Sequence, residues 1–537
     1  MLNADVDARH RNWFVITYWF KFVGSNSDSF NPATPTQTQS LVPMLKTLYQ
    51  WMFRFIGVRD LYQKVVVEDR LTNIRPQIRA DLEELLKHAN DKSEYFRGKF
   101  SDFLSETQSA TDDEFFAAYA KLPALTKQDY AQAGQTVMTE PWSNVDPAEA
   151  NFSVRGKPWE SLKRLRGDDY LMKMATGGST SMPLSVTMTK HHMFSMLFTF
   201  FKCWYRMGWR PGERMLVFYP KNTYNIDDMV KFNPYSKLLG FKYHLFDKID
   251  EDTVRGLVDD INAYKPKLLL VFPSPMNMIA HTIRKLDLKL THHPELVNVS
   301  GETFFDCQRK HIESVFTKSK VEDSYGSVEL GELAHETDDG LEIFANVAYV
   351  ETALNEANQP EMIITRLKLS DFPFIRYKMK DIADVEFRQY EDGTEKYLIS
   401  KIEGKDSNYI MSDRGERFYP SFFNDFVNQL NAQVDDSIIE IKVYERGQMQ
   451  LEIQYILRDS NHAAQVESLT REMLGPVMSN SMEYVIKFVD FIDHDYRRKY
   501  RVIERIGDIE FAGGMVGDGG AAKESAIKEI VEQETVG

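Results

Sequence analysis

The chain has 537 residues, 43% of them hydrophobic and 12% aromatic, so it can bury a large core in more than one domain. Its 80 acidic residues outnumber its 65 basic ones, and the resulting net charge of −15 argues against nucleic acid as a partner. The two cysteines, Cys203 and Cys307, lie far apart. This spacing disfavours a disulfide framework or a cysteine-rich zinc site and fits a cytoplasmic protein.

The N-terminal region contains an apolar stretch, residues 13–23, that is too short to span a bilayer. No secretory signal and no transmembrane segment are therefore expected. We expect the stretch to pack on the main body, and a peripheral membrane contact of the N-terminus is the alternative. An exposed linker follows over residues 25–40, and apolar spacing predicts helices over residues 75–91 and 112–122.

The loop TGGSTSMPL, residues 176–184, follows a strand-like stretch (169–175) and precedes an apolar helical one (187–205). Its two adjacent glycines let the backbone turn where a side chain would clash. Its hydroxyls and backbone N–H groups could surround the oxygens of a nucleotide phosphate. The loop lacks the Gly-Lys-Ser/Thr ending of a P-loop and is not GxGxxG. A turn between packed elements is the alternative interpretation.

Further along, strands and helices alternate. Residues 213–220, 237–247 and 265–275 end in apolar strands, and residues 254–265 form the helix between the last two. This alternation predicts an α/β fold with a largely parallel sheet and helices on both faces. Ligands of such sheets bind at the carboxyl ends of the strands. After residue 340 the strand-like segments predict an appended β region.

The C-terminal part predicts a compact α+β unit. Residues 437–457 form a β-hairpin that turns at Arg446-Gly447, and a helix over 461–478 and a strand over 482–491 follow. We therefore predict an N-terminal helical extension (1–120), a large domain (121–404), a small C-terminal domain (405–510) and a flexible tail (511–537).

Three later segments follow the phosphate loop in a fixed order along the chain. They are Ser300-Gly301-Glu302 at a strand end, the motif YGSVE at 325–329, and IRYKMKD at 375–381. Together with the loop at 176–184 they resemble the motifs of the adenylate-forming superfamily of acyl-CoA ligases. The likeness is greatest to its phenylacetate–CoA ligase branch and the capsular-polysaccharide-associated relatives, and it covers residues 120–505.

The resemblance implies a two-step reaction. A carboxylic acid attacks the α-phosphate of ATP to give acyl-AMP and pyrophosphate, and a thiol, usually that of coenzyme A, then attacks the acyl carbon. Catalysis of this kind rests on positioning and charge stabilisation. The implied fold is a large N-terminal domain with mixed and parallel sheets flanked by helices, plus the β region and a small mobile α+β domain that rotates about residues 404–408.

The resemblance also implies roles for particular residues. Glu329 would hold Mg²⁺, a hard ion suited to carboxylate and phosphate oxygens. Asp381 would bind the ribose hydroxyls, Lys499 would reach the α-phosphate, and Arg376 would also be catalytic. The other expected nucleotide contacts come from the phosphate loop, the two central motifs and the hinge: Thr176, Gly177, Gly178, Ser179, Thr180, Ser181, Gly301, Glu302, Tyr325, Gly326, Ser327 and Lys405.

The chain departs from the family pattern at four places, one of which is the segment RYKMKD at 376–381, where the family reads RYRTGD. Ser181 stands where the phosphate loop usually ends in glycine, and Lys405 replaces an arginine of the hinge. The C-terminal turn DYRRKYRV aligns either Lys499 or Arg498 with the catalytic lysine, and we prefer Lys499. Two alternatives to a coenzyme A ligase follow. One is an enzyme that passes the acyl group to an amine, a hydroxyl or a carrier protein, and the other is a degenerate nucleotide-binding scaffold.

Overall fold

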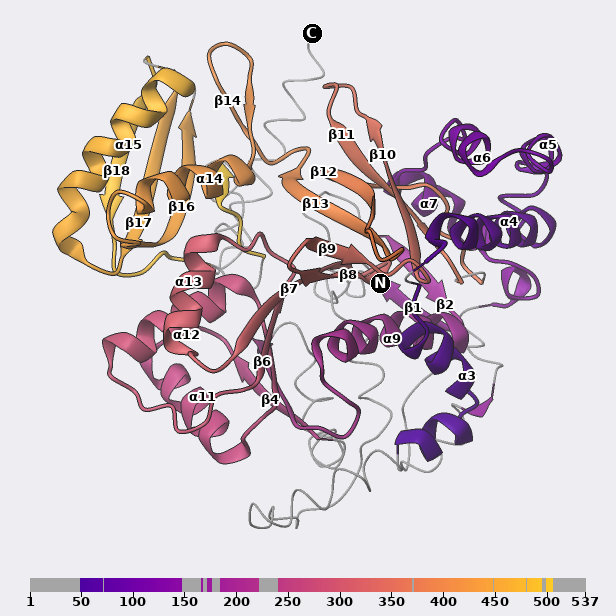
Figure 1. Cartoon of the computed structure of the whole chain (residues 1–537), viewed down its shortest axis with the longest axis horizontal. Helices are drawn as coiled ribbons and strands as arrows, with labels where there is room; N and C mark the ends of the chain where they lie inside the picture. The colour runs from indigo at the N-terminus through magenta and orange to yellow at the C-terminus, as the bar shows by residue number, and fades with distance from the viewer. Residues whose placement is uncertain are drawn as a thin grey trace, which may run out of the picture. The chain divides into compact units, whose positions relative to one another are not determined.

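The computed structural model describes residues 49–70, 72–146, 166–167, 171–175, 184–221, 240–368, 371–447, 449–479, 481–494 and 499–505. These residues form two compact units (Figure 1). The larger unit runs to Ser407 and also includes Tyr419–Asn428 and Asp493–Tyr500. The smaller unit comprises Asn408–Phe418, Gln429–Ile492 and the described chain from Arg501. The chain thus first changes unit within the predicted hinge segment, 404–408.

One mixed sheet organises the larger unit. Its strand order is β10-β11-β12-β13-β9-β8-β7-β6-β5-β3-β4. In chain order the strands are β3 (Met215–Pro220), β4 (Phe241–Phe246), β5 (Leu268–Val271), β6 (Leu296–Ser300), β7 (Lys320–Ser327), β8 (Gly331–Thr337), β9 (Gly340–Ile343), β10 (Ala348–Leu354), β11 (Pro360–Arg366), β12 (Tyr377–Gln389) and β13 (Glu395–Lys405). The strands from β4 to β7 pair in parallel, and all pairings from β7 to β10 are antiparallel. The strands after residue 340 therefore extend the same sheet.

Helices cover both faces of the parallel strands. Along β5, Leu268 and Leu270 belong to the same core cluster as residues of α9 (Lys190–Met207), whereas the buried Leu269 and Val271 do not. Because side chains alternate along a strand, these two pairs face opposite sides. The second side carries α11 (Glu251–Tyr264), α12 (Pro273–Lys285) and α13 (Asp306–Val315), which lie together beside β4 and β6 (Figure 1). The predicted parallel sheet with helices on both faces is confirmed.

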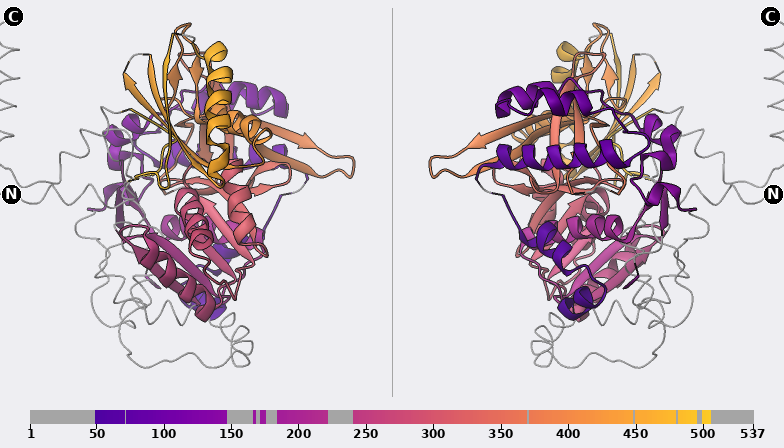
Figure 2. Two further views of the ribbon diagram at one scale, coloured as in Figure 1. Left: turned by 90° about the vertical axis from the view of Figure 1, so that its left-hand side faces the viewer. Right: turned by 90° about the vertical axis from the view of Figure 1, so that its right-hand side faces the viewer.

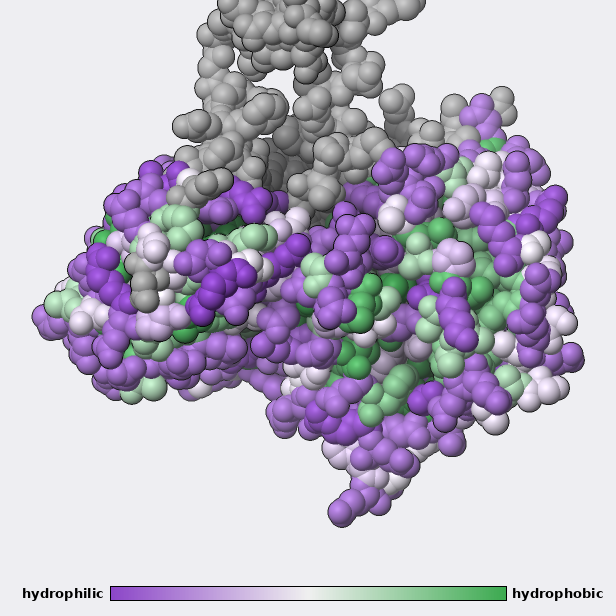
Figure 3. Space-filling view, turned by 90° about the horizontal axis from the view of Figure 1, so that it is seen from above, coloured by the Kyte–Doolittle hydropathy of each residue, from purple (hydrophilic) through white to green (hydrophobic). Residues whose placement is uncertain are grey.

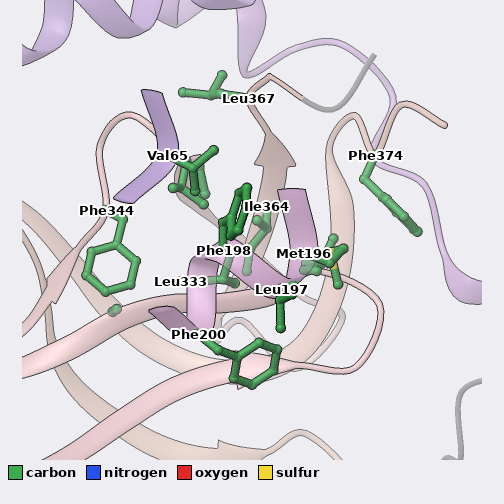
Figure 4. Close-up of a cluster of buried hydrophobic side chains, with 14 of the residues drawn as sticks. Val65, Met196, Leu197, Phe198, Phe200, Leu333, Phe344, Ile364, Leu367 and Phe374 are labelled. Atoms are coloured by element: carbon green, nitrogen blue, oxygen red, sulfur yellow. The ribbon is translucent and has the colours of Figure 1, made fainter. Parts of the chain in front are cut away.

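Local sequence explains the limits of α9. The Thr189 hydroxyl accepts a hydrogen bond from the His192 amide at 3.1 Å, which satisfies one free N–H of the first turn. Gly208, with φ of +111°, ends the helix in a left-handed conformation that favours glycine. Between these caps the helix is buried almost throughout, and its aromatic and aliphatic side chains meet those of β8 and β11 in the core shown in Figure 4.

The described N-terminal region is helical and packs on the larger unit. It contains α3 (Arg59–Tyr62), a π-helical turn (Gln63–Val67), α4 (Ile74–Lys92), α5 (Ser101–Glu106), α6 (Asp112–Tyr119) and α7 (Lys127–Ala133). Side chains of these helices share the main core cluster, and the Tyr119 and Thr365 hydroxyls lie 2.6 Å apart. The helices α4 to α7 lie beside β10 to β12 (Figure 2). The apolar stretch at 13–23 and the linker at 25–40 lie outside the described residues.

The smaller unit has a four-stranded sheet of order β18-β17-β16-β19. Its elements are β16 (Ile438–Gly447), β17 (Gln450–Leu457), α15 (Ala463–Val477), β18 (Glu483–Phe488) and β19 (Ile503–Arg505), with a short pair β14 (Ile410–Met411) and β15 (Arg417–Phe418). The hairpin predicted at Arg446-Gly447 is present between β16 and β17. Helix α14 (Pro420–Asn431) belongs mostly to the larger unit. The tail predicted over 511–537 lies outside the described residues.

The described surface is mostly polar, with apolar residues in patches between charged ones in the view of Figure 3. Within the described ranges, no helix combines the length and the apolar character that crossing a bilayer requires.

Candidate active site

The predicted site residues gather at the carboxyl ends of β5, β6 and β7. Phe272 follows β5, Gly301 and Glu302 follow β6, and Tyr325 lies near the end of β7. Parallel strands end at the same edge of a sheet, so residues far apart in the sequence meet there. The connection between β1 (Met172–Ala175) and β2 (Ser185–Met188), which pair at Ala175 and Ser185, contains the predicted phosphate loop. The loop residues Thr176, Gly177, Gly178, Ser179, Thr180 and Ser181 themselves lie outside the described residues.

Gly301 leaves space that any other residue would fill. Its φ of +85° is left-handed, and a Cβ there would lie 3.3 Å from the Phe272 ring and 3.7 Å from Lys499 Nζ. The Phe272 ring stacks on Tyr219, with 4.7 Å between ring centroids. Because Gly301 has no side chain, the space between the Phe272 ring and the Lys499 ammonium is left for a ligand.

The Glu302 carboxylate ties two distant segments together. Its Oε2 accepts a hydrogen bond from the Ser274 amide at 3.0 Å, in the first turn of α12. Its Oε1 accepts one from the Tyr500 amide at 2.9 Å. Burial raises the pKa of Glu302, and these two donors oppose that rise. Glu302 was expected only to line the nucleotide, and the structure adds that it fixes the chain next to Lys499.

Asp381 is held by two donors. The Tyr325 hydroxyl donates to its Oδ2 at 2.7 Å, and Lys405 Nζ lies 2.8 Å from its Oδ1. Lys405 also donates to the Met379 carbonyl at 3.1 Å. Asp381 is 7% exposed, so its carboxylate is fixed in orientation and largely shielded from water. The register of β12 and β13 sets this contact, because Asp381 and Lys405 face each other across the two strands.

Glu329 lies in the turn between β7 and β8, half-buried, and accepts a hydrogen bond from the Tyr377 hydroxyl at 3.0 Å. Two neighbours shape this turn. The Ser327 hydroxyl accepts from the Leu330 amide at 3.2 Å. At Gly326 a Cβ would lie 2.5 Å from the Gly331 carbonyl oxygen, so only glycine allows the two strands to approach this closely.

Lys127 joins this group, although no sequence motif singled it out. It is the first residue of α7, where Thr126 and Asp129 form a reciprocal capping box. Burial lowers the pKa of Lys127, while the charge of Glu329 raises it and that of Lys405 lowers it further. Lys127 therefore lies close enough to Glu329 and Lys405 to interact with both.

Lys499 lies where the other groups meet. Burial within the surrounding protein is the main cause that lowers the pKa of Lys499, and Lys405 acts in the same direction. The carboxylates of Glu302, Asp381 and Glu329 oppose that shift. The side chain is nevertheless exposed to solvent. The ammonium of Lys499 is thus near three carboxylates and also reached by water.

Arg376 does not join the group. Its side chain, 3% exposed, pairs with Glu351 at 3.2 Å and donates to the Tyr119 carbonyl, so it points into the core beside α6. Its backbone φ of +48° is left-handed, a conformation that the surrounding structure must enforce. In this structure the Arg376 side chain therefore forms an interior ion pair and does not face the other expected site residues. Arg498, the alternative to Lys499, lies outside the described residues.

A cluster of metal ligands is not part of the site as described. Within the described ranges, no group of three or more histidine, cysteine, aspartate and glutamate side chains could hold a metal ion. The half-buried Glu329 carboxylate is suited to supply a single oxygen ligand.

Comparisons with known proteins agree with this architecture. The fold matches two crystal structures of 2-hydroxyisobutyryl-CoA ligase in the postadenylation state, one in complex with 2-HIB-AMP and one with R3-HIB-AMP, at TM-scores of 0.58 and 0.57. In each case sequence identity is 17%, and the match covers 81% of this chain and 90% of that one. No family model matches the sequence.

The chain therefore shares the α/β fold of these structures, with a large mixed-sheet domain and a small C-terminal α/β domain. This is the fold that the resemblance of the motifs to the adenylate-forming superfamily implied. Among curated proteins the chain is a distant relative of Protein CapK of Staphylococcus aureus. The two are 22% identical over 336 residues, which cover 61% of this chain and 71% of CapK.

Proposed function

We propose that the protein activates a carboxylic acid with ATP. A carboxylate oxygen of the acid forms a bond to the α-phosphorus of ATP, and the bond from that phosphorus to the oxygen of the pyrophosphate group breaks. The products are acyl-AMP and pyrophosphate. The observation that carries the proposal is the meeting of Lys499 with Gly301, Glu302, Glu329 and Asp381, which come from four separate segments.

The residues present fit a nucleotide. The space beside Gly301, between the Phe272 ring and Lys499, suits a planar group that approaches the backbone closely. Asp381 offers carboxylate oxygens already oriented by Tyr325 and Lys405, an arrangement suited to accepting hydrogen bonds from a pair of ribose hydroxyls. We assign the phosphates to the loop Thr176–Ser181 from the sequence alone.

Lys499 would act through its charge. Negative charge builds on the α-phosphate oxygens as the acid attacks, and an ammonium fixed beforehand stabilises that charge without reorganisation. Glu302 holds the backbone at Tyr500 and so positions Lys499. When Mg²⁺ accompanies the nucleotide, Glu329 would provide one oxygen ligand, with the Tyr377 hydroxyl fixing the carboxylate.

The second step would transfer the acyl group. With coenzyme A, the thiolate forms a thioester bond to the acyl carbon as the bond from that carbon to the AMP oxygen breaks, and the thiol proton is lost to solvent. This acceptor is supported by the structural similarity to 2-hydroxyisobutyryl-CoA ligase. An amine, a hydroxyl or a carrier protein would take the acyl group by the same displacement.

The test measures products. Purified protein, ATP, Mg²⁺ and a panel of aryl, aliphatic and amino acids should release pyrophosphate only when a suitable acid is present. Coenzyme A added to the reactive acid should then yield AMP and an acyl-CoA that mass spectrometry detects. Acyl-AMP without acyl-CoA would replace coenzyme A by another acceptor. Tight ATP binding with no pyrophosphate from any acid would favour the scaffold alternative.

A further inference from the structure

A buried carboxylate beside the site has no role in the chemistry just described. Glu332 lies on β8, paired across the hairpin with Gly326, and is 5% exposed. Its Oε2 would lie 2.8 Å from a Cβ at Gly326, so the carboxylate packs directly against the motif that carries Tyr325. Its amide donates to the Thr199 hydroxyl of α9 at 2.9 Å, which fixes the backbone at this point.

One oxygen of this carboxylate lacks a donor. Ser324 stabilises the charged form of the group, yet among the described residues no hydrogen-bond partner reaches Oε2. Burial raises the pKa of Glu332 to about 7, and the charge of Lys499 opposes that rise. A buried acceptor left without a donor is costly, and a native structure that retains one usually has a use for it.

Glu332 interacts with an aromatic side chain and with Lys499. On one side lies Tyr219, whose own pKa is raised first by burial and then by the charge of Glu332. Tyr219 stacks on Phe272, whose ring lines the space beside Gly301. On another side Glu332 interacts electrostatically with Lys499. An aromatic wall, a buried acceptor and the lysine of the reaction thus border one region.

We propose that Glu332 selects the acid, by accepting a hydrogen bond from a donor group that the substrate carries besides its carboxylate. The inference rests on the proposed function, in which Lys499 marks the α-phosphate that the carboxylate of the acid attacks. Its substrate class is therefore carboxylic acids with a hydroxyl or an ammonium group. An ammonium group would be favoured most, because a buried carboxylate gains more from a charged partner than from a neutral one.

The experiment uses acids matched in shape. Three trios serve: phenylalanine, phenyllactate and phenylpropionate; leucine, 2-hydroxy-4-methylpentanoate and 4-methylpentanoate; and the 4-aminomethyl, 4-hydroxymethyl and 4-methyl benzoates. For each, kcat/KM of acid-dependent pyrophosphate release is measured, together with the rise in Tm that the acid causes in the presence of α,β-methylene-ATP. In at least one trio we expect a donor-bearing acid to exceed its unsubstituted partner by about 10- to 100-fold, the range of one good hydrogen bond to a charged group.

Three variants make the test specific to this carboxylate. Glu332→Leu should abolish the preference for both hydroxy and amino acids over unsubstituted acids. Glu332→Gln, which keeps an acceptor without the charge, should retain the preference for hydroxy acids and lose the preference for amino acids. Glu322→Gln is the matched control, because Glu322 is also buried with an unpartnered oxygen but pairs with Lys320. The charges that chiefly act on Glu322 are those of Lys320, Glu336 and Arg309. Glu322→Gln should leave the preference unchanged.

The outcomes separate the two proposals. If unsubstituted acids react as well as their partners, or if Glu332→Leu keeps the wild-type preference, the role of Glu332 is overturned while adenylation stands. If the wild-type protein releases no pyrophosphate with any acid, the proposed function itself fails and the inference fails with it. The Tm of each variant without ligand shows whether it is folded.

Discussion

The contact between Tyr325 and Asp381 makes a sharp prediction about nucleotide binding. The hydroxyl donates at 2.7 Å to a carboxylate that is 7% exposed, so removing it leaves one oxygen of a shielded anion without its donor. A hydrogen bond to a charged group contributes about 1.5–3 kcal/mol. At about 1.4 kcal/mol for each factor of ten, Tyr325→Phe should weaken ATP binding about 10- to 150-fold if Asp381 binds the ribose.

The assay is titration calorimetry with ATP, accompanied by thermal unfolding of each variant. Phe keeps the ring, so Tyr325→Phe tests the hydroxyl alone, and Tyr325→Leu then tests the ring. Asp381→Asn should cost at least as much as Tyr325→Phe. Because both act through one contact, the double variant should bind ATP about as weakly as Asp381→Asn alone. Unchanged affinity in Tyr325→Phe, or strictly additive losses in the double variant, would refute this reasoning.

Three further predictions concern packing and charge. Gly326→Ala should lower stability by about 1–3 kcal/mol through overpacking and weaken ATP binding, whereas Gly98→Ala, whose Cβ would meet nothing within 4 Å, should leave ATP affinity intact; calorimetry and Tm decide. Burial raises the folded-state pKa of Glu332 to about 7, so between about pH 4.5 and 7 the folded protein holds a proton that the unfolded chain has lost. The contribution of Glu332 to stability therefore falls as the pH rises through that window. Glu332→Gln should lose less stability over the same window, and equal pH profiles of the two proteins would contradict this prediction. Arg376→Met should cost about 3–5 kcal/mol of stability by leaving the carboxylate of Glu351 buried alone, and adding Glu351→Leu should recover most of it; a variant that is fully stable but inactive would restore the catalytic role.

Sequence alone could locate much of the site because its motifs follow strands. Once the segments ending at Ser300 and Ser327 are recognised as parallel strands, their carboxyl ends must meet at one edge, and Gly301, Tyr325 and Glu329 come together there. The positions of Asp381 and Lys499 followed from motif resemblance. Chain-order reasoning could not show that β8 to β13 continue the same sheet, because antiparallel additions leave no mark of their order in the sequence.

The sequence motifs could not predict the direction in which a side chain points. Arg376 sits in a matching segment, but its left-handed backbone and the buried Glu351 direct its side chain into the core. Lys127 and Glu332 were missed for a related reason. Each is an ordinary charged residue in the sequence and gains its significance only from neighbours that arrive from distant segments. The one available signal for Lys127 was the capping pattern of Thr126 and Asp129, which fixes the first turn of α7.

The most direct test of the central claim is isotope exchange between ATP and pyrophosphate in wild-type protein, Lys499→Ala, Glu329→Ala and Arg498→Ala, with the acid that supports pyrophosphate release. Removing a preorganised charge from the transition state costs about 100- to 1,000-fold in rate. The account predicts acid-dependent exchange in the wild type and in Arg498→Ala, and a collapse of this size in Lys499→Ala and Glu329→Ala. Exchange that survives in Lys499→Ala and disappears only in Arg498→Ala would contradict the assignment of Lys499.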